Sequence, residues 1–157
     1  MTRRSERIGR SGEYLTCSVL ARESDTVTVM PHTSHADVIF EWEHKLYRCQ
    51  VKTVTHIESK YKNWRFDLRK GITTTGRHYK KDQIDIIAMV NLEYQTVCFK
   101  AFSDCKTTQI TIKDEIMKSI NSVESLKEAM ESIILATDGR QGKNESTSGT
   151  KKAAING

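Results

Sequence analysis

The strongest constraint on the fold comes from residues 84–90, "IDIIAMV", in which six of the seven side chains are apolar. A strand with one solvated face alternates between apolar and polar residues, whereas a strand covered on both faces reads as a nearly continuous apolar run. This run therefore predicts a central strand with packing layers on both sides of its sheet.

The rest of the chain supplies the other strands and the covering helices. Residues 36–42 and 46–54 alternate as two strands joined by the tight turn "EHKL", with Val38, Phe40 and Trp42 on one face of the first strand. Ser11 is a candidate N-cap that would place Glu13 in the first helical turn. Helices are expected over residues 5–24 and 112–136, with a break near Asn121, and further strands over residues 25–31, 64–69 and 96–102.

This order of elements predicts an α/β fold with a mixed central β-sheet flanked by helices. With 157 residues, the chain has the length of one domain. We expect that domain to span residues 1–136. Residues 137–157 are small, polar and rich in Gly and Ser, and we expect them to form a disordered, basic tail.

Basic charge is concentrated in the middle of the chain. Residues 44–81 contain 11 of the 25 Lys and Arg residues but only 2 of the 20 Asp and Glu residues. The segments before and after this block, residues 1–43 and 82–138, are both net acidic. Such a local concentration of positive charge indicates a polyanionic partner, most often a nucleic acid.

Several other classes of protein are disfavoured. No apolar run approaches the length of a membrane span, and no apolar signal segment follows the basic N-terminus. The four cysteines include no CxxC pair, which favours reduced, structural thiols and a cytoplasmic location. A zinc site built from these cysteines with His32 or His35 is a less favoured alternative, because the spacing does not match common zinc sites.

Three polar side chains on the predicted hairpin suggest metal chemistry. Asp37 begins one strand, and Gln50 and Lys52 share one face of the next. Mg²⁺ binds hard oxygen ligands, takes one or two carboxylates, and activates water for attack on phosphate. The carbonyl of Val51 is a further candidate ligand. A lysine beside such a metal can orient the water and balance the developing negative charge.

The same residues carry a resemblance to a known family. Asp37 followed by "QVK" resembles the PD-(D/E)XK nuclease motif in its QxK variant, and "GEYL" resembles the Gly-Glu of the preceding helix. The later "FDLR" and "HYKKDQIDIIAMV" are similar to conserved blocks of one branch of these nucleases. That bacterial and phage branch is similar to a small homing endonuclease encoded in a cyanobacterial group I intron and to archaeal Holliday-junction resolvases.

The resemblance implies a restriction-endonuclease-like core and a Mg²⁺-dependent endodeoxyribonuclease, with Mn²⁺ as an expected substitute. It implies that Asp37 is the main metal ligand, that Gln50 fills a position usually held by an acid, and that Glu13 completes the site. Lys52 would be the catalytic lysine. The motif's usual proline is replaced by Ala36. We expect Asp85, in the later apolar run, to have a structural rather than a catalytic role.

The function expected from these observations is site-specific cleavage of double-stranded DNA by a homing endonuclease. The host would be a bacterium, a phage or an organelle genome. Two active sites are needed to cut two strands, so we expect a homo-oligomer, either a dimer or a tetramer. The residues expected to contact DNA phosphates are Lys60, Lys62, Arg69, Arg77, Tyr79, Lys80 and Lys81.

Three other functions remain open from the sequence. A Holliday-junction resolvase would select branched DNA rather than a sequence. A DNA-binding module of the same fold would have lost catalysis, and the neutral Gln50 is the feature that allows this interpretation. An RNA-binding protein would bind RNA at least as well as matched DNA.

Overall fold

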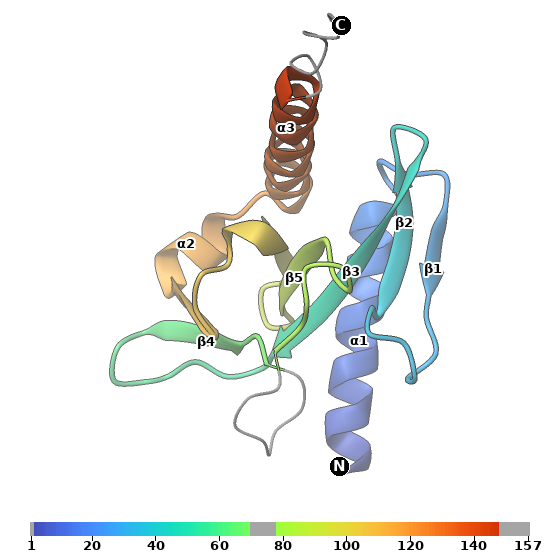
Figure 1. The fold of residues 1–157 in the computed structure, drawn as a ribbon. Helices are drawn as coiled ribbons and strands as arrows, with labels where there is room; N and C mark the ends of the chain where they lie inside the picture. The colour runs from blue at the N-terminus through green and yellow to red at the C-terminus, as the bar shows by residue number, and fades with distance from the viewer. Residues whose placement is uncertain (1, 70–77, 148–157) are drawn as a thin grey trace, which may run out of the picture.

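A five-stranded sheet forms the centre of the computed structural model, which describes residues 2–69 and 78–147 (Figure 1). Its strand order is β1-β2-β3-β5-β6, and only the pairing of β3 with β5 is parallel. The predicted mixed α/β architecture is therefore confirmed. The strands are β1 (Val27–Val29), β2 (Val38–Trp42), β3 (Lys45–Val54), β5 (Ile86–Asn91) and β6 (Thr96–Ala101).

Both faces of this sheet are covered, as the apolar run predicts. All six residues of β5 are buried. Ile86, Ala88 and Val90 pack with helices α1 (Arg3–Leu20) and α3 (Ser122–Thr147) in one core. Ile87 and Met89 pack on the opposite face against β4 (Asn63–Asp67), β7 (Gln109–Lys113) and α2 (Asp114–Ser119), which form a second core.

The hairpin between β2 and β3 closes through a two-residue turn. Glu43 and His44 have φ angles of 49° and 67°, and Trp42 pairs with Lys45. Two consecutive positive φ angles are typical of the turn whose twist matches that of the flanking strands. Val38 and Phe40 are fully buried, which confirms the predicted face of β2.

Helix α1 begins earlier than the sequence indicates. Thr2, rather than Ser11, is the N-cap, and its side chain accepts a hydrogen bond from the Ser5 amide. Glu13 consequently lies deep within the helix, beyond the first turn, where the positive end of the helix dipole has little influence on it. The prediction of a Ser11 cap is wrong because the polar first turns of α1 continue without interruption from Thr2.

The C-terminal part of the described chain differs from the prediction at the start of the expected helix. Residues 109–113 form strand β7, so the N-terminal end of the predicted helix over residues 112–136 belongs to a sheet instead. The predicted break near Asn121 is confirmed: the Asn121 Oδ1 atom accepts hydrogen bonds from the Val123 and Glu124 amides and caps α3. A short 3₁₀ helix, η1 (Phe102–Asp104), follows β6.

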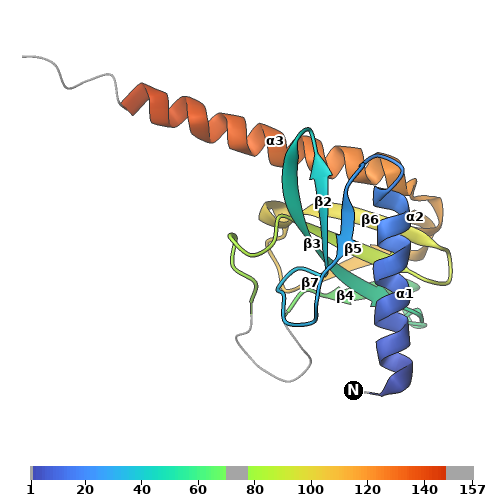
Figure 2. The ribbon, with the colours of Figure 1, turned by 90° about the vertical axis from the view of Figure 1, so that its right-hand side faces the viewer.

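Helix α3 also continues to Thr147, whereas a disordered tail was expected from residue 137. Figure 2 shows that the later part of α3 projects past the other elements. Once Leu126, Ala129 and Met130 anchor the helix in the core, each further residue adds a hydrogen bond without a new nucleation cost. Gly139 costs only about 1 kcal/mol within such a helix. Residues 148–157 lie outside the described residues.

Among the described residues, no helix is both long and apolar enough to cross a membrane.

Candidate active site

The Asp37 carboxylate lies at the point where β2 and β3 begin to pair. The Asp37 amide donates to the Cys49 carbonyl over 3.0 Å, and its own carbonyl accepts from the Met30 amide over 2.8 Å. Its Oδ2 atom accepts a hydrogen bond of 2.9 Å from the Val51 amide. The backbone of three neighbouring segments therefore fixes both the main chain and the side chain of Asp37.

Gln50 lies beside this carboxylate with one oxygen left over. Its side chain forms a hydrogen-bonding interaction with Asp37. The residue is 7% exposed, and its Oε1 atom has no hydrogen-bond partner among the described residues. A buried carbonyl oxygen without a partner costs about 1–3 kcal/mol, so native structures rarely keep one without a reason. A cation bound between Gln50 and Asp37 would provide that reason.

Lys52 follows on the same face of β3 and is held from two sides. Its Nζ atom donates to the Arg69 carbonyl over 2.9 Å and lies 5.4 Å from the centre of the Tyr79 ring. Burial lowers the pKa of Lys52, while Asp37 and Asp67 act in the opposite direction. An ammonium has three donors, so the bond to Arg69 leaves two for other acceptors.

Tyr79 covers this lysine. Burial, and then the charge of Asp37, raise the pKa of Tyr79 to about 12, so its hydroxyl is protonated at neutral pH. The sequence predicts a DNA contact for Tyr79. The structure places its ring over Lys52, close enough to Asp37 for the two to interact electrostatically.

Glu13 approaches the same carboxylate from α1, and Gly12 makes this possible. A Cβ atom at Gly12 would overlap Oγ1 of Thr53 in β3, with the Thr53 Cβ and Cγ2 atoms at 3.0 Å. The helix backbone therefore lies directly against the sheet at this point. Thr16 donates its hydroxyl to the Gly12 carbonyl over 2.9 Å and satisfies that buried acceptor.

The two carboxylates interact with each other. Burial raises the pKa of Glu13, and the charge of Asp37 raises it further. Burial also raises the pKa of Asp37, although the Val51 amide, Lys52, His32 and Gln50 all oppose this. Carboxylates whose charges are disfavoured in this way gain from a nearby cation, which supports the ligand roles predicted for them.

His32 is a neighbour of this site that the sequence analysis did not assign. Its charge lowers the pKa of both Glu13 and Asp37, so it lies near both. The only signal in the sequence is its position in the loop before Asp37, and loop histidines without a function are common.

Oxygen donors of this kind would suit a hard cation better than zinc, which favours nitrogen and sulfur ligands. Within the described residues, no group of three or more His, Cys, Asp or Glu residues could hold a metal ion. Each of the four cysteines is a free thiol. Two carboxylates and an unpartnered amide oxygen are what Mg²⁺ accepts, because it retains several water ligands. The Val51 carbonyl stays a predicted ligand.

The predicted basic residues do not form one uniform patch. The Arg69 guanidinium is held by the Asp67 carboxylate through three hydrogen bonds, which partly neutralise its charge. The turn before β4, which contains Lys60 and Lys62, extends away from α1 and β2 on the left of Figure 1. Lys80 and Lys81 are exposed. Arg77 lies outside the described residues.

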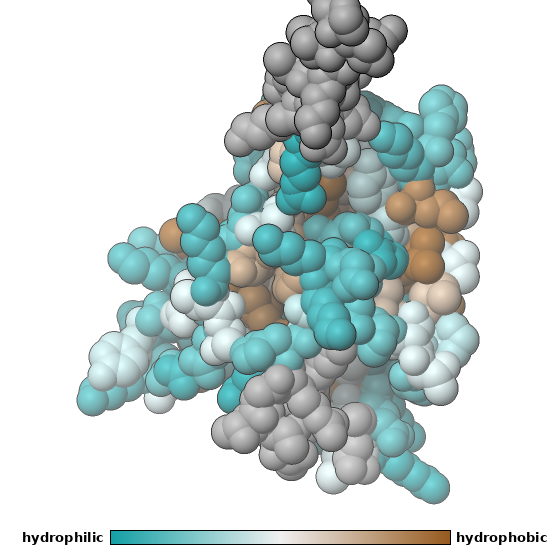
Figure 3. Space-filling model, viewed as in Figure 1, coloured by the Kyte–Doolittle hydropathy of each residue, from teal (hydrophilic) through white to brown (hydrophobic). Residues whose placement is uncertain are grey.

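The face of the molecule shown in Figure 3 is mostly hydrophilic, with a small hydrophobic area over β1. Val29, in that strand, is 38% exposed. Asp85 has the structural role expected for it: its carboxylate accepts from the Arg48 amide over 2.8 Å and from the Arg48 guanidinium over 3.0 and 3.1 Å.

Comparison with solved structures finds a protein of similar fold. The chain is similar to the bacterial homing endonuclease I-Ssp6803I, with a TM-score of 0.62 and 16% sequence identity. The match covers 87% of this chain and 97% of that one. The chain has the fold of that endonuclease. No protein-family model matches the sequence, and no curated protein matches it either.

Proposed function

We propose that the protein is a Mg²⁺-dependent DNA endonuclease. The observation that carries this proposal is the unpartnered Oε1 atom of Gln50, buried beside the Asp37 carboxylate and two residues from the half-buried Lys52. Most buried side-chain oxygens in native structures have a partner, and a bound cation would supply one for Gln50. The fold shared with a homing endonuclease supports the proposal by analogy, while the residues of the site decide the chemistry.

In this proposal, Asp37, Glu13 and Gln50 hold the Mg²⁺ ion, together with the Val51 carbonyl. Mg²⁺ would lower the pKa of a bound water and neutralise charge that develops on the phosphate. Mn²⁺, which also accepts oxygen ligands, is the expected substitute.

Lys52 has the second role. Two of its three N–H donors remain for the attacking water and a phosphate oxygen, because the third donates to Arg69. Burial lowers its pKa, which makes the ammonium a better proton donor and brings the amine form closer to neutral pH. The Tyr79 ring lies over the ammonium, with its centre 5.4 Å from the Nζ atom, and shields that side of it from water.

Within this class, we propose a homing endonuclease acting on double-stranded DNA as a homo-oligomer. The solved structure with the same fold is described as a homing endonuclease. A chain with one such site can cut one strand at a time, so cleavage of a duplex at one position requires two copies.

The test compares two substrates in the presence of Mg²⁺ or EDTA. The purified protein is incubated with supercoiled plasmid DNA and with a mobile four-way junction. We expect Mg²⁺-dependent nicking or linearisation of plasmids that contain a cognate site. Cleavage of the junction alone would indicate a resolvase instead.

Two further outcomes identify the remaining alternatives. DNA binding that EDTA leaves unchanged, with no nicking under Mg²⁺ or Mn²⁺, would identify a binding module that lacks catalysis. Preference for an RNA duplex over the matched DNA duplex would indicate an RNA-binding protein.

A further inference from the structure

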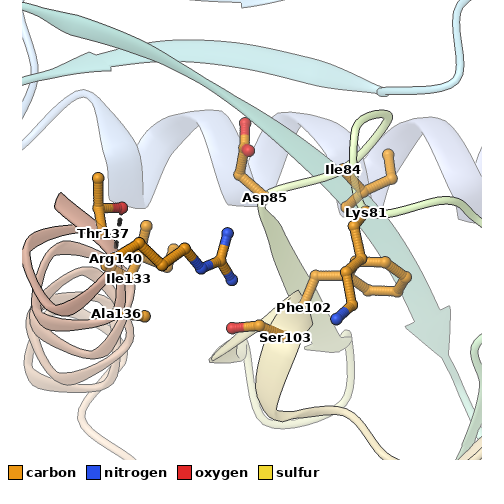
Figure 4. A pocket seen from close by; sticks show the side chains of 9 residues that line it. All are labelled: Lys81, Ile84, Asp85, Phe102, Ser103, Ile133, Ala136, Thr137 and Arg140. Carbon is orange, nitrogen blue, oxygen red and sulfur yellow. Dashed lines mark hydrogen bonds between the residues drawn. The ribbon is translucent and has the colours of Figure 1, made fainter. Parts of the chain in front are cut away.

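A polar cavity lies between α3, η1 and the segment before β5 (Figure 4). Its volume is about 110 Å³, several times the ~30 Å³ that one water molecule occupies. Ile133, Ala136, Thr137 and Arg140 contribute one face of α3, at the spacing of residues that lie one above another on a helix. Lys81 lines the cavity from the opposite side.

The charged residues that line this cavity are two cations, Lys81 and Arg140, and one acid, Asp85. Asp82 and Asp104 lie next to the lining residues Lys81 and Ser103 in the sequence. Lys81 and Arg140 form no ion pair with any described residue. Asp85 is the acid in the lining, and its charge is balanced by the Arg48 guanidinium at 3.0 Å. Figure 4 shows Arg140 reaching from α3 toward Asp85 and Ser103. Lys81, Ser103 and Arg140, all of them exposed, line a space large enough for a tetrahedral oxyanion.

The cavity is also close to the candidate active site. Asp85 is bonded to Arg48, which precedes Gln50 by two residues on β3, and two residues of a strand span about 7 Å. A nucleic-acid strand carries one phosphate per ~3.4 Å of helix axis. A nucleic-acid strand that follows β3 from a scissile phosphate at Gln50 and Lys52 would pass Arg48 on the side of this cavity.

The geometry points to a phosphodiester-binding site in this cavity, where Lys81 and Arg140 hold one backbone phosphate of DNA that flanks the cleaved position. This inference rests on the proposed function, since it names a contact made by the same bound strand. It also gives a role to the part of α3 beyond residue 136. A basic pair formed by one loop and one helix can recognise the backbone but carries no sequence information.

The experiment measures DNA binding in EDTA, so that catalysis plays no part. The dissociation constant of a linear plasmid-derived duplex is determined over a range of salt concentrations for the full chain and for Lys81→Ala, Arg140→Ala and the double variant. Lys127→Ala is the control, because it removes the same charge from the same helix at a position where the ammonium faces Glu124 at 3.8 Å. Circular dichroism verifies that each variant is folded.

We expect each single variant to bind about fivefold more weakly, with a salt slope flatter by up to about 0.9. Because the two cations hold one phosphate, the double variant should lose less than the product of the two single losses. Lys127→Ala should bind like the unmodified protein.

Affinity and salt slope unchanged in Arg140→Ala would overturn the assignment of this cavity, even if the protein binds and cuts DNA through Lys52. Absence of any DNA binding by the unmodified chain would overturn both this inference and the proposed function. Titration with inorganic phosphate provides a third readout. Phosphate binding that is lost in Arg140→Ala, with DNA affinity unaffected, would make the cavity a site for a free anion and refute the DNA contact.

Discussion

Gln50 has 7% of its surface exposed in the middle of β3, and its Oε1 atom is unpartnered among the described residues. Folding alone would favour an apolar side chain at this position, since an unsatisfied buried oxygen costs about 1–3 kcal/mol. Metal binding and stability therefore make opposite demands on this residue, and a substitution can separate them.

We predict that Gln50→Leu keeps or raises the free energy of unfolding in EDTA, by up to about 1 kcal/mol. The same variant should lose Mg²⁺-dependent cleavage. Urea unfolding and a plasmid assay measure the two effects. Gln109→Leu, at an exposed position of β7, serves as the control and should cleave normally. Normal cleavage by Gln50→Leu would show that its oxygen is not a ligand.

The Asp37 carboxyl group provides a test that depends on pH. Its raised pKa means that the folded protein binds this proton more tightly than the unfolded chain does, so the ionised form costs stability at neutral pH. Below the unfolded value of 3.8, the group is protonated in both states and the cost disappears. An asparagine keeps an acceptor for the Val51 amide but carries no charge.

We therefore predict that Asp37→Asn is more stable than the unmodified protein at pH 7 in EDTA. The difference should shrink as the pH falls toward about 4, because protonation relieves the same cost in the unmodified chain. Denaturant unfolding at several pH values measures this. If Asp37→Asn were less stable than the unmodified protein at pH 7, the hydrogen bonds and Lys52 would stabilise the ionised Asp37 by more than its burial destabilises it.

Among the elements, the contact between α1 and β3 positions the site. Gly12 allows the helix backbone to lie against Thr53, and the neighbouring Glu13 then reaches Asp37. The close approach depends on two small structural details: the missing Cβ atom of Gly12 and the exact place of Thr53 on the strand.

We predict that Gly12→Ala destabilises the protein by about 1–3 kcal/mol, the usual cost of overpacking a core. Cleavage should fall more than stability explains, because Glu13 moves with the helix. Thr53→Ala in the same chain removes the Oγ1 and Cγ2 atoms that the new methyl group would meet, and should restore most of both. A Gly12→Ala variant with normal stability and activity would show that the helix has room to shift.

The range over which each sequence pattern acts explains which parts of the site can be predicted from the sequence. The alternation in β2 and β3 and the two-residue turn place Asp37 beside Gln50 and Lys52, because each signal acts over a few residues. The closeness of Gly12 to Thr53, of Tyr79 to Lys52 and of Arg140 to Lys81 depends on how distant segments pack. Local patterns carry no such information. The length of α3 was also misjudged, since its anchoring in the core outweighs the glycines that follow.

For the whole molecule, the account requires more than one copy of the chain, since a single site cannot cut both strands of a duplex together. We predict a dimer or a tetramer in solution or on DNA, measured by sedimentation or by light scattering coupled to sizing chromatography. If the protein were a monomer both free and bound to DNA, it could nick one strand, and the proposed double-strand cleavage would be wrong.

The most direct test of the central claim is the cleavage rate of Lys52→Met in Mg²⁺. Methionine is an unbranched apolar side chain of nearly the same length, and it removes the ammonium that lies over the Tyr79 ring. Lys45→Met, at the exposed start of the same strand, is the matched control. The account predicts that Lys52→Met binds DNA as the unmodified protein does but cuts it at least about 100-fold more slowly, the usual contribution of a positioned proton-transfer group. Equal cleavage by Lys52→Met and Lys45→Met would contradict it.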